Sequence, residues 1–413
     1  MGKEKDTKRV PFAEWVSTFG KDYKNSITKA SITPRYEKIP SKAIGMTYAM
    51  CGGWPHGGRL YEIAGPNSTG KTTLAFRAIG DFLDAFSDKK VLFIDVEQSL
   101  DIEYQCRMNG IDSNRVYIWK PKVGMSGEQI LGSILDMSMQ IEDISLIVID
   151  SIPALIPSID LEEEFEKDNG MRGTLAKYLY KWLRESLPIL AEYKIDLLAL
   201  NQTRVKGKTY TGTDILDEPC GEALKYYSSI RIRCGKKVFV DENGEELEYK
   251  KESATQKAQN PTTGEGASGI RINFAITKSK VASTARGGGY VTYLNNSGLA
   301  YVHDLYEVAS KLGFVDKVNQ SRYQLLDVDT KEPLNDENGK PLYGYEKDLL
   351  NYLNTHEEFT KNYLEKLSNK LSQSQDTLGN LLDEIIAKEI ADEEKAVAGS
   401  SVISTKDFEN DEE

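Results

Sequence analysis

The sequence predicts an α/β fold with a mostly parallel central sheet flanked by helices. Short, continuous apolar runs of strand length recur between Leu60 and Tyr293, as is typical of strands covered on both faces of a parallel sheet. Between them lie helical patterns, for example Leu74, Ala78 and Phe82 on one stripe. Strands that alternate with helices indicate a doubly wound core.

The elements follow from these patterns in chain order. A short helix at Phe12–Phe19 and a strand at Ser26–Ile32 come first. The expected core strands are Leu60–Ala64, Val91–Asp95, Val116–Trp119, Leu146–Asp150, Leu197–Leu200, Ser229–Arg233, Ile270–Ile276 and Tyr290–Tyr293. A long helix is expected at Arg172–Glu192 and a helical region at 345–372. Polar, glycine-containing stretches predict exposed loops at 158–173 and 203–222 and an insertion at 241–269.

The charge of the chain is concentrated at one end. The 413 residues carry a net charge of −12, which at first argues against a nucleic-acid partner. Residues 383–413, however, hold eleven carboxylates against three lysines. The acidity therefore belongs mostly to the tail, and the body of the chain is free to carry a local basic groove.

Composition also limits the cellular setting. The cysteines Cys51, Cys106, Cys220 and Cys234 lie far apart, and the chain has only three histidines, so neither a zinc site nor a disulfide framework is expected. No apolar run reaches the length of a membrane span, and the charged N-terminus does not look like a secretory signal. We expect a cytoplasmic protein with no membrane partner.

The strongest motif is a phosphate-binding loop. Residues Gly65, Pro66, Asn67, Ser68, Thr69, Gly70, Lys71 and Thr72 match G-x-x-x-x-G-K-[ST] at every fixed position, between an apolar strand and an amphipathic helix. In such a loop the backbone N–H groups and the helix N-terminus hold one anion. Lys71 would neutralise the β- and γ-phosphates, and the Thr72 hydroxyl would bind Mg²⁺. The motif predicts ATP and Mg²⁺ as ligands.

Carboxylates at two strand ends complete the expected nucleotide site. Asp150 ends the run Leu146–Asp150 at the sheet edge where ligands bind in open α/β sheets, and we interpret it as the second Mg²⁺ ligand. Asp95 and Glu97 end the strand that follows the phosphate loop. Alternation along an extended strand places both on one face, so the spacing alone leaves open which of them activates water.

At this point the chain resembles the bacterial RecA recombinases. The similar segments are GPNSTGKTTL (65–74), FIDVEQSLD (93–101), LIVIDSIPAL (146–155), LNQTR (200–204), CGEALKYYSSIRI (220–232) and TKSK (277–280), together with IPSKAIGMTYAMCGGWPHGGRLYEI before the loop (39–63). They follow one another in the family's order over about residues 39–315. The resemblance fits a cellular enzyme and a virus-encoded relative equally, and it implies a RecA-like P-loop ATPase core with small N-terminal and C-terminal appendages.

The resemblance also implies roles for single residues. Glu97 takes the place of the catalytic glutamate, and Gln202 that of the γ-phosphate sensor. Tyr104 matches the residue that stacks on adenine, Asp101 the aspartate beside it, and Thr73 continues the phosphate loop. Lys278 and Lys280 match a pair that reaches the neighbouring protomer's γ-phosphate. Loops 158–173 and 203–222 match the DNA-binding loops, whose candidate contacts are Met171, Arg172, Lys177, Arg204, Lys206, Lys208 and Lys225.

The resemblance implies an ATP-dependent recombinase that forms helical filaments on single-stranded DNA and exchanges strands with double-stranded DNA. The expected divisions are a polymerisation segment at 1–38, the core at 39–315, a small C-terminal domain at 316–372 and an acidic tail at 373–413. Single-strand-binding and mediator proteins would be further partners, and the setting would be the nucleoid or, for a viral protein, the host cytoplasm.

Two questions stay open on the residues alone, namely the function and the role of the acidic tail. A ring-forming helicase or motor with the same core, and an ATP-gated DNA-binding scaffold that does not hydrolyse ATP, are the alternative functions. Motors of this kind usually place an arginine at the neighbour's nucleotide, where this chain has Lys278 and Lys280, which argues against a motor. Glu97 and Gln202 are residues expected to take part in hydrolysis, which argues against a scaffold that does not hydrolyse ATP. The acidic tail is either a solvated end or an autoinhibitory segment that competes with DNA phosphates.

Overall fold

A computed structural model gives the fold, and it describes residues 37–162, 174–208, 214–217, 222–247, 264, 266–280 and 287–372. The chain divides into two compact units, Met1–Glu37 and Lys38–Glu413, and all described helices and strands belong to the second. The predicted helix at Phe12–Phe19, the predicted strand at Ser26–Ile32 and the acidic tail lie outside the described residues.

The described elements of the first part of the chain run from β1 to α7. They are β1 (Lys38–Ile39), α2 (Ile44–Ala49), β2 (Trp54–Pro55), β3 (Leu60–Gly65), α3 (Lys71–Ala85), β4 (Lys90–Asp95), α4 (Ile102–Asn109), β5 (Val116–Trp119), α5 (Gly127–Gln140), β6 (Ile144–Asp150), α6 (Ser158–Glu162) and α7 (Thr174–Tyr193). Single 3₁₀ turns lie at Ser113–Arg115 and Ile152–Ala154.

The remaining elements run from β7 to α11. They are β7 (Asp196–Gln202), β8 (Arg204–Lys208), β9 (Asp214–Asp217), α8 (Glu222–Tyr227), β10 (Ile230–Val240), β11 (Gly269–Ser279), β12 (Gly288–Leu294), β13 (Gly298–Leu299), α9 (Val302–Lys311), β14 (Val315–Lys317), β15 (Tyr323–Leu325), β16 (Tyr343–Gly344), α10 (Glu346–Thr355) and α11 (Glu357–Ser372).

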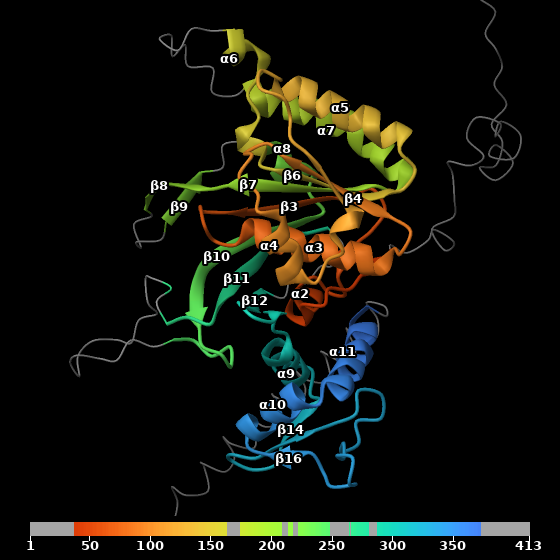
Figure 1. The fold of residues 1–413 in the computed structure, drawn as a ribbon, viewed down its shortest axis with the longest axis vertical. Coiled ribbons are helices and arrows are strands. Elements are labelled where there is room, and N and C mark those ends of the chain that lie inside the picture. Colours follow the sequence, from red (N-terminus) through yellow and green to blue (C-terminus); the bar gives the residue numbers. More distant parts are fainter. Residues whose placement is uncertain are drawn as a thin grey trace, which may run out of the picture. The chain divides into compact units, whose positions relative to one another are not determined.

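Within the described residues, nine strands form the central sheet in the order β13-β12-β11-β10-β3-β7-β6-β4-β5. The pairs from β10 to β5 are all parallel, and those from β10 to β13 are antiparallel (Figure 1). All of the core strands expected from the sequence are present, and the mostly parallel α/β prediction is confirmed.

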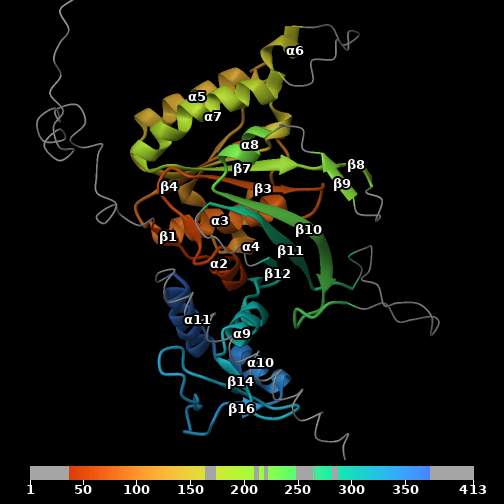
Figure 2. The same cartoon turned by 180° about the vertical axis from the view of Figure 1, so that it is seen from behind.

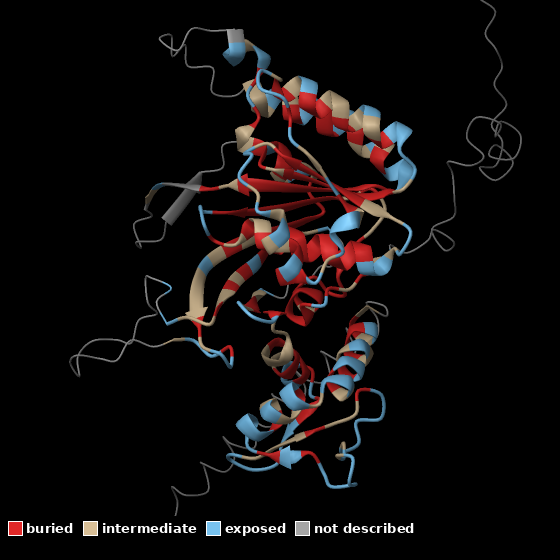
Figure 3. Ribbon diagram, in the orientation of Figure 1, coloured by how far each residue is buried: buried red, intermediate tan, exposed pale blue. Residues whose placement is uncertain are grey.

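Helices cover both faces of this sheet, and neighbouring residues along a strand pack on opposite faces. Phe93 of β4 joins the cluster beneath α3 and α4, whereas Leu92 and Ile94 join the cluster beneath α5 and α7. Figure 2 shows the two helical layers from behind, and the central strands are buried along most of their length (Figure 3). Burial on both faces explains the continuous apolar runs in the sequence.

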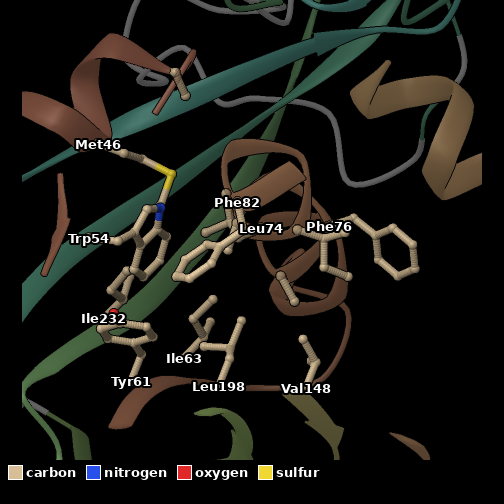
Figure 4. Close-up of a cluster of buried hydrophobic side chains, with 14 of the residues drawn as sticks. Met46, Trp54, Tyr61, Ile63, Leu74, Phe76, Phe82, Val148, Leu198 and Ile232 are labelled. Carbon is tan, nitrogen blue, oxygen red and sulfur yellow. The ribbon is translucent and has the colours of Figure 1, made fainter. Parts of the chain in front are cut away.

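The cluster beneath α3 contains the largest buried side chains. Trp54 and Tyr61 meet edge to face with ring centroids 5.1 Å apart, and Phe82 of α3 packs beside Tyr61 (Figure 4). Burying each such side chain stabilises the fold by roughly 1.5–3 kcal/mol. This cluster fixes α3 on the sheet, and α3 carries the end of the phosphate loop.

A third cluster holds the C-terminal part. It joins α9, α10 and α11 to Ile44 and Cys51 at either end of α2, and β14, β15 and β16 form a small antiparallel sheet beside it. The predicted helical region at 345–372 is two helices, which separate at His356. The predicted division at residue 315 falls inside this cluster and stays a prediction.

One predicted loop is corrected by the structure. The stretch 203–222 contains β8 and β9, which pair antiparallel as a hairpin, and its last residue begins α8. The glycine and threonine residues of this stretch are typical of a loop, and the register of the hairpin is irregular between Val205 and Gly207. The stretch 158–173 starts with the short helix α6. In the stretch 241–269, residues 241–247 fold back and form backbone hydrogen bonds with the end of β10.

Candidate active site

The phosphate loop joins β3 to α3, and its shape requires small residues. Gly70 has a φ of +91°, and a Cβ there would lie 2.4 Å from Ile272 Cδ1. A Cβ at Gly65 would lie 3.0 Å from the Cβ of Cys234 on β10. Ser68 also has a positive φ, of 59°. The loop is therefore closely backed by β10 and β11, and a larger residue at Gly70 would distort it.

Lys71 is the first residue of α3 and turns back into the loop. Its Nζ donates to Pro66 O at 2.8 Å, and Thr69 Oγ1 donates to the same carbonyl at 2.8 Å. Burial lowers the pKa of Lys71, and the carboxylates of Asp150 and Glu97 partly oppose that effect. The cation thus lies at the helix N-terminus, where an anion is also favoured by the backbone N–H groups.

Thr72 and Asp150 lie together, as the metal-site prediction requires. Thr72 Oγ1 donates to Asp150 Oδ2 at 2.9 Å. Burial raises the pKa of Asp150 to about 6, with a further contribution from the negative charges of Glu97 and Asp95 and a reduction by the Thr72 hydrogen bond. A hydroxyl beside a carboxylate, in a group of repelling carboxylates, fits the binding of Mg²⁺.

Asp95 and Glu97 do not share one face as expected, because β4 ends at Asp95. Asp95 is buried, its Oδ2 makes no hydrogen bond within the described part of the chain, and Lys120 Nζ lies 3.9 Å from it. Glu97 is exposed. Of the two, only Glu97 is placed to reach a water molecule or a ligand outside the sheet.

Glu97 accepts two hydrogen bonds at the sheet edge. Gln202 Nε2 donates to Glu97 Oε1 at 2.7 Å, and Ser151 Oγ donates to the same oxygen at 2.5 Å. Gln202 ends β7 directly opposite Gly65 of β3, and Thr203 N donates to Gly65 O at 3.1 Å. The predicted general base, the predicted sensor and the phosphate loop therefore meet at the carboxyl ends of β4, β7 and β3, on one edge of the parallel sheet.

Asp101 and Tyr104 are in contact, as residues expected at the same adenine site should be, and the contact between them is a helix N-cap. Asp101 is the N-cap of α4, and its Oδ1 accepts from Tyr104 N at 3.1 Å. The Tyr104 ring is half-buried against the cluster beneath α3, with Arg107 Cζ 5.9 Å from its centroid. The cap is a role beyond the one expected of Asp101, and its sequence signal is an aspartate directly before a helix.

Lys278 and Lys280 bond to α8 in this structure. Lys278 Nζ donates to the carbonyls of Lys225 and Tyr226, the second at 2.9 Å, and Lys280 Nζ donates to Tyr227 O at 3.1 Å. Burial lowers the pKa of both lysines, and each repels a neighbouring cation. Both ammonium groups thus bond to the last turn of α8 of their own chain, and their expected contact with a neighbouring copy stays a prediction.

The predicted DNA contacts are divided among several elements. Lys177 lies on α7 and is exposed, Lys206 is exposed on β8, and Lys225 on α8 pairs with Glu222 at 2.8 Å. Arg204 and Lys208 are the first and last residues of β8. Met171 and Arg172 lie outside the described residues.

A buried ion pair that the motifs do not predict joins β10 to β3. Arg231 Nε of β10 pairs with Glu62 Oε2 of β3, and Asn201 Nδ2 of β7 donates to Glu62 Oε1 at 2.8 Å. Glu62 is fully buried. The sequence signal for this pair is the single charged residue, Glu62, inside the apolar run LYEIA. A charge in a central strand needs a buried partner.

The phosphate loop, the half-buried pair of Thr72 and Asp150 and the Glu97–Gln202 contact define a P-loop nucleoside triphosphatase. The family model described as the RecA N-terminal domain matches residues 12–285. Since it covers more than half of the chain, the chain belongs to the RecA family of ATP-dependent recombinases, whose members are DNA-dependent ATPases.

Curated relatives agree with this assignment. The mitochondrial DNA repair protein recA homolog of Dictyostelium discoideum is 29% identical over 392 residues, which cover 92% of this chain and 78% of that one. Protein RecA of Mycoplasma mobile is 31% identical over 64% of this chain and 70% of its own length. The solved RadB recombinase structure aligns with 62% of this chain and 95% of that one, at 18% identity and a TM-score of 0.40.

None of the helices in the described part of the chain is long and apolar enough to cross a bilayer.

Proposed function

We propose that this chain assembles as a helical filament on single-stranded DNA, pairs it with a homologous duplex and exchanges strands, with ATP held between neighbouring copies. The observation that carries this proposal is the hydrogen bond between Gln202 and Glu97. It connects the expected water-activating carboxylate to the strand that leads directly into the β8–β9 hairpin. Nucleotide chemistry and a DNA-binding segment would thereby share one strand end.

We assign ATP to the loop from Gly65 to Thr73. The backbone of the loop and Lys71 would hold the phosphates, while Thr72 and Asp150 would bind Mg²⁺, which supplies charge neutralisation on the phosphate oxygens. Tyr104 would face the adenine ring. Asp101 caps α4, so its proposed role beside adenine would be indirect, through the position of Tyr104.

Hydrolysis would depend on Glu97, with support from two neighbours. Glu97 would accept a proton from the attacking water, because it is the exposed carboxylate at this edge. Ser151 and Gln202 both donate to its Oε1, so they would orient the carboxylate and leave its second oxygen to receive the proton. When Gln202 moves toward a γ-phosphate, that support would change.

Lys278 and Lys280 are proposed to act on the neighbouring copy. Their hydrogen bonds to α8 place them beside the segment that follows the hairpin, and neither donates to a described residue of its own phosphate loop. In a filament the pair would stabilise the negative charge that develops on the neighbour's γ-phosphate. DNA would contact the two loops through Met171, Arg172, Lys177, Arg204, Lys206, Lys208 and Lys225.

We also propose a cytoplasmic setting, with single-strand-binding and mediator proteins as further partners. Cys106 and Cys234 are buried free thiols, which fits a reducing compartment.

The experiment compares the unmodified protein with K278A/K280A and with a control, K340A/K347A, in which two exposed lysines of the C-terminal part are removed. Electron microscopy with a non-hydrolysable ATP analogue and single-stranded DNA should show long filaments for the unmodified and control proteins. A strand-exchange assay should show product for the same two. The K278A/K280A protein should lose DNA-stimulated hydrolysis while it still binds nucleotide.

Closed rings would favour a helicase or motor, and filaments that yield no strand exchange would favour a scaffold. Full DNA-stimulated hydrolysis by K278A/K280A would contradict the proposal that the lysine pair of a neighbouring copy completes the ATP site.

A further inference from the structure

Residues 120–128 touch two parts of the proposed mechanism. They form the loop after β5 and the first turn of α5, and we call them the β5–α5 connection. One end of the connection contacts the turn that follows Glu97. The other end contacts the chain beside residues 158–173, which are proposed to bind DNA and are called the first DNA loop.

Gln98 holds the chain directly after the proposed general base. Its φ is 53°, in the left-handed region that residues with a Cβ rarely adopt. A side-chain hydrogen bond supports this conformation, because Gln98 Nε2 donates to Pro121 O at 3.2 Å. On the other side, Glu97 N donates to Asp150 O at 3.3 Å. The position of Glu97 therefore depends on a turn that is attached to the connection at Pro121.

The other end of the connection holds the entry to the first DNA loop. Gly127 N donates to Ile156 O at 2.7 Å. Ser158 N donates to Glu128 Oε2 at 2.9 Å, and Ser158 Oγ donates to Glu128 Oε1 at 3.3 Å. A Cβ at Gly127 would lie 3.2 Å from the Cβ of Leu155. The connection and the loop entry are therefore in close contact.

The same helix also holds the exit from the first DNA loop. α7 begins at Thr174, directly after the loop. Tyr178 OH donates to Glu128 O at 3.4 Å, and Trp182 Nε1 donates to Leu131 O at 2.9 Å. Figures 1 and 2 show α5 and α7 side by side, with α6 beyond one end of the pair. Glu128 is therefore bonded to described residues on both sides of the loop.

The charge of Glu128 strengthens its contact with the loop entry. Burial raises the pKa of Glu128, but hydrogen bonds from the backbone N–H groups of Glu128 and Ser158 and from the hydroxyls of Ser126 and Ser158 outweigh burial, so the pKa is lowered. An ionised acceptor forms stronger hydrogen bonds than a neutral one. Removal of the carboxylate should therefore release Ser158.

We infer that the β5–α5 connection couples the first DNA loop to Glu97, with Glu128 and Gln98 as positioning residues at its two ends. The inference rests on the proposed function, in which this loop binds DNA. DNA that repositions the loop would displace the first turn of α5 through Glu128, and the displacement would reach Glu97 through Pro121 and Gln98. Neither positioning residue would touch ATP or the attacking water.

A covalent route to the same loop sets the size of the expected effect. β6 ends at Asp150 and leads to α6 through the single turn at Ile152–Ala154. The inferred coupling acts beside this route and does not replace it. Loss of the connection should therefore reduce the stimulation of hydrolysis by DNA without abolishing it.

The test measures steady-state ATP turnover of the full-length protein with and without saturating single-stranded DNA, and the ratio of the two rates is the stimulation factor. E128A should lower this factor about threefold or more. Its DNA-free turnover should stay within about twofold, because Glu128 is not among the residues assigned to ATP. E142A, which removes an exposed carboxylate beyond the other end of α5, is the matched control. E128Q keeps an acceptor oxygen and should recover at least half of the lost stimulation.

A double variant tests whether the two residues act through one segment. Q98A should also lower the stimulation factor about threefold, and Q140A, on an exposed glutamine at the end of α5, is its control. If both act through the connection, the factor of Q98A/E128A should lie within about 1.5-fold of the lower single variant. Independent actions would instead multiply the two losses.

The outcomes separate this inference from the proposed function. A normal stimulation factor in E128A, beside a stimulated unmodified protein, would overturn the inference and leave the proposed function standing. Equal losses in E128A and E142A, an equal fall of both rates in E128A, or fully multiplied losses in the double variant would also overturn it. An unmodified protein without stimulation would contradict the proposed function itself, and the inference with it.

Discussion

Glu97 shows how a single side chain is selected by its position at the end of a strand. Asp95 and Glu97 are equivalent in the sequence, but β4 ends between them, so Asp95 is buried and Glu97 is exposed. Glu97 alone accepts hydrogen bonds from Ser151 and Gln202. The end of β4 therefore decides which of the two carboxylates can act as a general base, because both residue types could do so.

We predict that E97Q loses hydrolysis and keeps nucleotide binding. The amide cannot accept a proton as a carboxylate does, and general-base catalysis contributes about 10²–10⁴-fold to rate. Steady-state ATP turnover should fall by that factor, while affinity for a fluorescent ATP analogue stays within about threefold. E103Q, on an exposed residue of α4 with the same charge change, is the control. Normal turnover by E97Q together with loss in D95N would assign the role to Asp95 instead.

A second prediction concerns the buried pair of Glu62 and Arg231. R231M leaves the Glu62 carboxylate buried without its cation, so we expect a loss of about 3–5 kcal/mol in the free energy of unfolding. The double variant E62M/R231M removes both charges and should recover most of that loss. Urea-induced unfolding followed by circular dichroism measures both. A double variant as unstable as R231M would show that the pair is not the cause.

At the scale of elements, Asp327 connects the small sheet to α11. Its Oδ1 accepts from the backbone N–H groups of Thr330 and Asp329, at 3.0 and 2.9 Å, and its Oδ2 pairs with Lys366 of α11 at 3.0 Å. These contacts, the Thr330 hydrogen bond first, lower the pKa of Asp327 to about 2. The C-terminal part therefore depends on a charged carboxylate.

The sign of the pH dependence follows from that pKa. Because the folded pKa is below the unfolded value of 3.8, the ionised carboxylate stabilises the fold above about pH 4, and this contribution is lost as pH falls through 2. At neutral pH we expect D327N to lower the free energy of unfolding by up to about 2 kcal/mol. Thermal unfolding midpoints from pH 2 to 7 should show this gap close toward pH 2. D136N, on an exposed residue of α5, should show no such gap.

The elements could be predicted from the sequence to very different degrees. The phosphate loop and the core strands were recognisable because a local motif or a continuous apolar run specifies each of them. The β8–β9 hairpin was missed because its pairing depends on residues whose composition resembles a loop. The contact of Lys278 and Lys280 with α8 joins segments about fifty positions apart, and no local pattern carries that information.

The candidate site shows the same limit. Lys71, Thr72 and Asp150 were predicted from spacing and are found together, since strand ends of a parallel sheet converge at one edge. The N-cap role of Asp101 and the burial of Glu62 were not predicted, because each depends on which backbone or side chain lies opposite. Sequence patterns identify the groups that carry chemistry, and tertiary packing decides which group each one contacts.

At the scale of the whole molecule, assembly is the property that most needs an experiment. We predict that deletion of residues 1–35 leaves a monomer that still binds ATP, because the proposed polymerisation strand is removed and the phosphate loop is kept. Analytical ultracentrifugation of the truncated protein measures its size, and a fluorescent ATP analogue measures binding. Polymers of the truncated protein would contradict the assigned role of this segment.

The acidic tail leads to a further prediction at this scale. If its carboxylates compete with DNA phosphates for cations, truncation after Leu382 should strengthen binding to duplex DNA and reduce its dependence on Mg²⁺. Fluorescence anisotropy over a range of salt concentrations measures the change. Unchanged affinity would show that the tail is only a solvated end.

The hydrogen bond from Thr203 to Gly65 has a mechanical consequence. β7 continues into the β8–β9 hairpin through Thr203, and Thr203 N is bonded to the carbonyl at the mouth of the phosphate loop. If the hairpin binds DNA as proposed above, tension on the hairpin would reach the phosphate loop through this backbone hydrogen bond, without an intervening side chain. Extension of the bound DNA would then change how tightly the loop holds the nucleotide.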